Sequence, residues 1–145
     1  MLWRCRMSER KYLPTIADLI DRLSISLMKS IFIDREPYRT EVALLKEDIR
    51  SCMVEWAKQE RYADPAELIY ATMVLMLSNR YIWENEAIAR KSGKGGRLRA
   101  THSVNGVRTR AKNEISKIFG ERIDEKIDCL AADLPPEMGN WNVFE

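Results

Sequence analysis

Residues 64–86, DPAELIYATMVLMLSNRYIWENE, carry the clearest signal of the fold. It opens with the signals of a helix start, because Asp64 can cap free amides, Pro65 suits the first turn and Glu67 stands at the third position. Residues 68–77 are apolar on nearly every side, so we expect the first half of this helix to be buried. The second half mixes polar groups with aromatic rings. One long helix therefore anchors the predicted fold.

The rest of the chain keeps a helical spacing of apolar residues. A capped start at Thr15 opens a first helix, which we expect Pro37 to stop, because proline lacks the amide hydrogen that a helix interior needs. Gly120 is the expected C-terminal cap of a fourth helix. No segment of the sequence alternates in the manner of a strand. The expected helices are residues 15–36, 42–56, 65–91, 98–119 or 101–119, and 121–132.

These helices predict an all-α protein, an antiparallel bundle of four to five helices with an apolar C-terminal tail. At 145 residues the chain is long enough for one domain with one core. We expect an N-terminal extension over residues 1–13, the bundle over residues 14–134 and the tail over residues 135–145. Apolar side chains in the tail need a groove, which we expect on their own bundle, with exchange between copies left open. These side chains are Met138, Trp141, Val143 and Phe144.

Charge is distributed very unevenly along the sequence. The chain holds 24 Lys and Arg residues against 22 Asp and Glu. Eight of the 24 lie between Glu86 and Glu114, where no residue is acidic, so the rest of the chain has 16 basic residues against 22 acidic ones. A ligand of this segment should be anionic, and we expect phosphate in a nucleotide or a nucleic acid. The eight cations are Arg90, Lys91, Lys94, Arg97, Arg99, Arg108, Arg110 and Lys112.

Composition argues against several other classes of protein. The scattered Cys5, Cys52 and Cys129 form no Cys-x-x-Cys pair, so they predict neither a disulfide framework nor a zinc site and suit a reducing compartment. No apolar run approaches the roughly 20 residues that span a bilayer, and we expect no secretory signal. A pI near 8.4 is too mild for a domain that binds duplex DNA. We therefore expect a cytoplasmic protein.

Two helix faces are candidate walls of a binding site. The fourth helix carries a polar face, because His, Asn, Thr and Ser residues recur at steps of three and four, with Arg and Lys beside them. Near the end of the third helix, Trp83 could stack on a base while Asn and Arg bind polar groups. The alternative left open is a solvated surface beside a core tryptophan. The predicted ligand-binding residues are Asn79, Trp83, Arg90, His102, Asn105, Arg108 and Lys112.

A magnesium-dependent enzyme is the alternative from another class. The Glu-x-x-Asp spacing of Glu121 and Asp124, or of Glu125 and Asp128, resembles half of the motif of the MazG-type nucleotide pyrophosphohydrolases. In these all-α enzymes a Glu-x-x-Glu precedes the Glu-x-x-Asp. The resemblance implies a Mg²⁺ site and nucleotide hydrolysis, but the first helix has aspartates in place of the paired glutamates. No nucleophilic triad or phosphate-binding glycine loop is recognisable, and no other cofactor is expected. The carboxylates of this alternative site are Asp18, Asp21, Glu121, Asp124 and Asp128.

Four segments resemble small uncharacterised all-helical proteins of tailed bacteriophages. They are residues 80–86, RYIWENE, residues 101–108, THSVNGVR, residues 120–128, GERIDEKID, and residues 139–145, GNWNVFE. The resemblance covers most of the chain after Met7 and brings no established function. It implies the cytoplasm of a bacterial host, where small phage proteins without enzyme motifs often inhibit a host protein or sequester a nucleotide signal.

The sequence thus predicts a non-enzymatic protein that binds a nucleotide-like anion, with sequestration of a host defence signal as the specific hypothesis. Two alternatives stay open, the magnesium-dependent hydrolase and an interaction module for a host protein or a nucleic acid. No membrane partner is expected. A homo-oligomer is compatible with the apolar tail.

Overall fold

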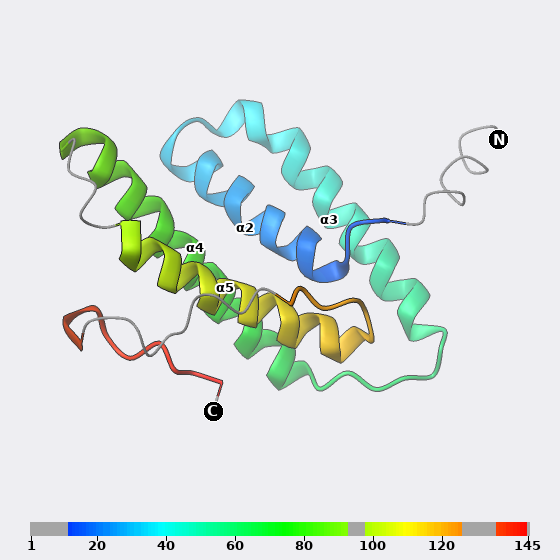
Figure 1. The fold of residues 1–145 in the computed structure, drawn as a ribbon. Helices are drawn as coiled ribbons and strands as arrows, with labels where there is room; N and C mark the ends of the chain where they lie inside the picture. Colours follow the sequence, from blue (N-terminus) through cyan, green and yellow to red (C-terminus); the bar gives the residue numbers. More distant parts are fainter. Residues whose placement is uncertain (1–11, 93–97, 126–135, 145) are drawn as a thin grey trace.

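The described part of the chain is built from helices. A computed structural model describes residues 12–92, 98–125 and 136–144, in which no strand occurs (Figure 1). The expected all-α class is confirmed. None of the described helices is both long enough and apolar enough to cross a membrane. The elements are α2 (Ile16–Phe32), α3 (Arg35–Ala57), α4 (Pro65–Ser92), α5 (Leu98–Phe119) and the short 3-10 helix η3 (Pro136–Met138).

Local sequence signals account for most helix ends. Thr15 and Asp18 form a reciprocal cap at the start of α2, where the Thr15 hydroxyl accepts from the Asp18 amide at 3.1 Å and the Asp18 carboxylate accepts from the Thr15 amide at 3.0 Å. Asp64 accepts the Ala66 amide at 2.9 Å before α4. Gly120 has a φ of 64° directly after α5, as a left-handed C-terminal cap requires.

Pro37 does not stop the first helix, so that prediction is wrong. α2 ends at Phe32, and α3 begins at Arg35, two residues before the proline. Asp34 caps α3 by accepting the Glu36 amide at 3.3 Å. Pro37 therefore lies in the first turn of α3, where the missing amide hydrogen removes no helical bond.

The helices form two antiparallel hairpins that pack together (Figure 1). α2 pairs with α3, α4 pairs with α5, and α2 also lies against both helices of the second hairpin. α3 is outermost and its one buried residue is Leu45, but Trp56 near its end packs edge-on against Phe119 at 5.2 Å. The central core consists of Ile16, Ala17, Ala71, Val74, Leu75, Val107, Ala111, Ile115 and Phe119.

The C-terminal tail packs on its own bundle, as expected. Trp141, Val143 and Phe144 lie against the core. Tyr81 meets Trp141 edge-on at 5.6 Å, Tyr70 meets Phe144 at 5.9 Å, and the Tyr70 hydroxyl donates to the Val143 carbonyl at 2.8 Å. The tail therefore runs antiparallel to α4 along one of its flanks.

The predicted fifth helix does not begin at residue 121. After Gly120 the chain turns away from the axis of α5, and residues 121–125 are not helical. The remainder of that predicted helix, residues 126–132, lies outside the described residues, as does Asp128. The left-handed Gly120 redirects the chain toward α2, where the Glu121 carboxylate accepts the Ile16 amide. Residues 121–125 make this contact instead of a new helical turn.

The first half of α4 is buried on one side only, which corrects the prediction for residues 68–77. Ala71 and Leu75 are almost fully buried, whereas Ile69, Met73 and Leu77 are 59%, 60% and 58% exposed. The reason is the layer arrangement, because α2 and α5 cover one side of α4 and the tail covers a flank. An apolar side of α4 therefore faces outward.

Candidate functional site

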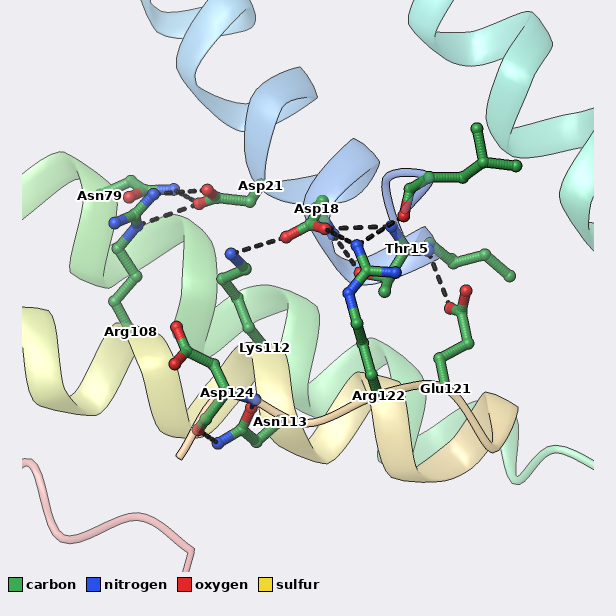
Figure 2. A network of polar contacts seen from close by, with 12 residues as sticks. Thr15, Asp18, Asp21, Asn79, Arg108, Lys112, Asn113, Glu121, Arg122 and Asp124 are labelled. Atoms are coloured by element: carbon green, nitrogen blue, oxygen red, sulfur yellow. Dashed lines mark hydrogen bonds and ion pairs between the residues drawn. The ribbon is translucent and has the colours of Figure 1, made fainter. Parts of the chain in front are cut away.

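A buried polar network joins α2, α4 and α5 (Figure 2). Arg108 of α5 holds Asp21 of α2 with two nitrogens, Nε to Oδ1 at 3.1 Å and Nη2 to Oδ2 at 2.5 Å. Asn79 of α4 donates to Asp21 Oδ1 at 2.9 Å and to Ser24 Oγ at 2.6 Å. The Asn105 side chain accepts from Arg108 Nη1 at 3.1 Å. The Asp21 side chain is only 9% exposed, so this carboxylate depends on its partners.

A second set of ion pairs lies around Asp18, one turn earlier on α2. Lys112 Nζ contacts Asp18 Oδ1 at 2.8 Å, and Arg122 Nη2 lies 3.5 Å from Oδ2. Burial acts to raise the pKa of Asp18, but hydrogen bonds from Lys112 and Thr15 outweigh it, and the pKa is lowered from its ordinary value. Asp18 is therefore ionised at neutral pH and compensates Lys112.

The chain after α5 closes over the start of α2. The Glu121 carboxylate accepts the Ile16 amide at 2.8 Å, which satisfies one of the free donors at the N-terminus of α2. Burial raises the pKa of Glu121 despite this hydrogen bond. Asn113 donates to the Asp124 carbonyl at 2.8 Å and accepts the Asp124 amide at 3.0 Å, so it fixes the same turn (Figure 2).

The structure brings together only part of the predicted ligand-binding set. Asn79, Asn105 and Arg108 belong to the network around Asp21, and Lys112 belongs to the pair with Asp18. Trp83 lies one turn after Asn79 on α4 and is partly buried, whereas His102 is exposed at the start of α5. Arg90, whose side chain is 81% exposed, lies 11 residues beyond Asn79, about 16 Å along α4.

The partners of Arg108 and Lys112 are two of the carboxylates expected for the alternative metal site. Asp18 and Asp21 are three residues apart on α2, and Arg108 and Lys112 are four apart on α5, so each pair occupies one side of its helix. Because α2 and α5 run antiparallel, Asp21 meets Arg108 and Asp18 meets Lys112. Matching acidic and basic pairs at one-turn spacing would have predicted this contact.

Three of the five carboxylates of the alternative metal site, those of Asp18, Asp21 and Glu121, are engaged in other contacts. Asp18 and Asp21 bind cations of α5, Glu121 binds a backbone amide, and the backbone of Asp124 is held by Asn113. Over residues 12–92, 98–125 and 136–144, no three His, Cys, Asp or Glu side chains lie close enough together to hold a metal ion.

A polar cavity of about 420 Å³ lies beside Asp18, between the start of α2 and the end of α5. Its lining includes two cations, Lys112 and Arg122, and three carboxylates, Asp18, Asp124 and Glu125. The charge of this lining does not favour an anion, because the acidic groups outnumber the basic ones.

The outward side of α4 is apolar and lies apart from the polar network. We call Ile69, Met73 and Leu77 the outer face of α4; they follow one another at four-residue steps and so form one stripe. Phe32, 53% exposed, lies at one end of the stripe, where Arg80 stacks over its ring at 4.1 Å. This stripe is accessible to another molecule.

An apolar cavity of about 290 Å³ adjoins the outer face of α4, between that helix and the tail. Leu77 belongs to both the stripe and the cavity, so the two surfaces are continuous. The other lining residues are Val74, Met138, Gly139, Asn140, Trp141 and Val143.

Comparison with protein-family models, with curated proteins and with solved structures found no match for this chain. The resemblance to bacteriophage proteins therefore stays a prediction. By its own features the protein is an all-α bundle with a paired polar network and an exposed apolar helix face.

Proposed function

We propose that this protein is a non-enzymatic interaction module that binds a protein partner through the outer face of α4. The observation that supports this most directly is the exposure of Ile69, Met73 and Leu77, each close to 60%. A helix that is apolar on every side is normally covered on every side. Here one side lacks a cover within the described residues, and a partner protein would supply it.

The expected gain from covering this face is substantial. Burying a large aliphatic side chain stabilises a complex by about 1.5–3 kcal/mol when the burial is complete, so each of the three partly exposed side chains offers about 1–2 kcal/mol. The adjoining cavity adds room for an apolar side chain of the partner. Contiguous apolar surface of this kind usually marks an interaction site.

The polar network supports the same proposal from another direction. The α5 cations nearest to α2, Arg108 and Lys112, already have carboxylate partners, so an anion would have to displace Asp21 or Asp18 to reach them. The network instead fixes α2, α4 and α5 relative to one another. A fixed helix presents its outward side chains at low entropic cost, which favours binding.

The test is photo-crosslinking in cells that naturally express the protein. A benzophenone amino acid at Met73 should give a crosslinked species of defined size, because the partner covers that position. The matched control carries the same group at Ser51, an exposed position on α3. Absence of a crosslink at Met73, or the same products at both positions, contradicts the proposal.

A second candidate function, binding of a nucleotide-like phosphate, is favoured by the exposed charge where α4 ends and α5 begins. Among the described residues, Arg90 forms a long ion pair with Glu86, 3.8 Å, and Lys91 and His102 are exposed. A nucleotide signal of the host cytoplasm is a ligand of this chemistry. In titration calorimetry with ATP, Arg90→Glu with Lys91→Glu should weaken binding about tenfold, or about 1.4 kcal/mol. The charge-matched control is Arg50→Glu with Lys58→Glu, and equal effects of the two pairs contradict this site.

A further inference from the structure

We propose that the polar cavity between the start of α2 and the end of α5 binds a small zwitterion, an α-amino acid with an aliphatic side chain. This cavity lies apart from the outer face of α4, so the inference does not depend on a partner there. The cavity measures about 420 Å³, and its lining carries charges of both signs.

A buried hydroxyl without a partner points to a ligand in this cavity. Ser116 is 3% exposed and belongs to the lining, and within the described part of the chain its hydroxyl neither donates nor accepts a hydrogen bond. The buried hydroxyls of Ser24 and Ser78, by contrast, each donate to a carbonyl of their own helix at 2.8 Å. A buried hydroxyl is normally paired, because an unpaired one costs free energy. A molecule bound in the cavity would supply the missing partner.

Two carboxylates of the lining call for a positive group. Asp124 and Glu125 come from the chain after α5, and no ion pair joins either side chain to another described residue. Asn113 holds the backbone of Asp124 and leaves its carboxylate free (Figure 2). An ammonium group has three N–H donors and pairs well with such oxygens. The ligand should therefore carry an ammonium.

The cations of the lining call for a negative group as well. Lys112 uses its ammonium for Asp18 at 2.8 Å, and Arg122 lies 3.5 Å from the same carboxylate. Two cations against one carboxylate leave a net positive charge, and both cations have further N–H donors. The N-terminal end of α2, capped by Thr15 in the same lining, adds positive potential. A carboxylate of the ligand would be held here.

Simpler ligands fit this lining less well. An anion alone meets an excess of carboxylates, and a cation alone meets Lys112 and Arg122. No three His, Cys, Asp or Glu side chains of the described residues converge on a point that could hold a metal ion. A zwitterion pairs with both kinds of charge. Ile123, 46% exposed, adds an apolar wall to the lining, which suits an aliphatic side chain.

An NMR titration of the backbone amides of the full chain with L-leucine tests the site. The amide signals of Ser116, Asp124 and Glu125 should shift saturably, with a dissociation constant of about 1 mM or below. Two related compounds separate the charges, since L-leucinamide lacks the carboxylate and isocaproate lacks the ammonium. Each should bind at least about tenfold more weakly, because one charged contact is lost.

Variants of the lining separate a built site from general attraction between charges. Asp124→Asn with Glu125→Gln should weaken leucine binding at least about tenfold. The charge-matched control is Asp48→Asn with Glu60→Gln, two exposed positions outside the cavity lining, which should bind leucine like the wild type. Unchanged helical circular dichroism shows that both double variants fold.

Ser116→Ala distinguishes a ligand contact from a structural one. It should weaken leucine binding about fivefold, because one hydrogen bond to the ligand is lost. The midpoint of urea unfolding without leucine should stay the same or rise, since the variant removes a buried hydroxyl that has no partner in the fold.

Three binding results overturn the inference, namely no saturable shift with leucine, leucinamide or isocaproate binding as tightly as leucine, or equal effects of the lining and control pairs. A lowered urea midpoint of Ser116→Ala together with unchanged leucine affinity also overturns it, because the hydroxyl would then stabilise the fold and not a ligand.

Discussion

Arg108→Ala should lower the free energy of unfolding by about 3–5 kcal/mol, because it leaves the Asp21 carboxylate buried without its cation. Asp21 is 9% exposed and receives two nitrogens of Arg108, and Asn79 alone cannot replace that charge. Urea unfolding followed by circular dichroism at neutral pH measures the change. The matched control is Arg39→Ala, whose pair with Glu36 is exposed and 3.7 Å long, and which should change stability by about 0.5 kcal/mol or less.

A companion variant separates loss of charge from loss of packing. Asp21→Asn combined with Arg108→Met removes both charges and keeps most of the volume, so it should recover part of the stability that Arg108→Ala loses. A cost below about 1 kcal/mol for Arg108→Ala would show that the pair is not needed for folding. Arg108 would then be available for a ligand, as its place in the acid-free segment first suggested.

Phe119→Ala should lower the free energy of unfolding by about 3–5 kcal/mol, because it would open a cavity in the buried core. Phe119 is 4% exposed and packs edge-on against Trp56, so it connects α5 to the outermost helix. The same urea titration measures the loss. Ile123→Ala, at a 46% exposed position just after α5, is the control and should stay within about 0.5 kcal/mol of the wild type.

The near-ultraviolet circular dichroism of the Phe119→Ala protein gives an independent check. Trp56 should lose its asymmetric surroundings when the ring beside it is removed, even where α3 remains helical. An unchanged tryptophan signal together with a small change in stability contradicts the view that Trp56 and Phe119 hold α3 to the core.

The sequence predicts features that depend on local chemistry. The caps at Thr15 and Asp64 and the left-handed Gly120 all occur where predicted, because a cap is decided by a few neighbouring residues. Pro37 shows the limit of a local rule, since a proline is equally compatible with the end of one helix and the first turn of the next. Contacts with the rest of the fold decide which of these two places the proline takes.

Features that depend on which helices meet were harder to predict. The apolar run around Met73 indicates burial on all sides, but the number of neighbours that a helix has is a property of the assembled layers. Arg108 and Asp21 are 87 residues apart, so their charges appear as two separate candidate sites until the antiparallel packing of α2 and α5 is known. The sequence indicates the right chemistry there but not the pairing.

The contact between Glu121 and the Ile16 amide also limits how far the chain can fold while it is being synthesised. These groups are 105 residues apart, and both aspartates of α2 likewise wait for side chains of α5. The α2–α3 hairpin therefore leaves the ribosome with the Ile16 amide and both aspartates of α2 still without their partners from the end of α5. Native closure must await the second hairpin, so the start of α2 is completed only by α5 and the residues directly after it.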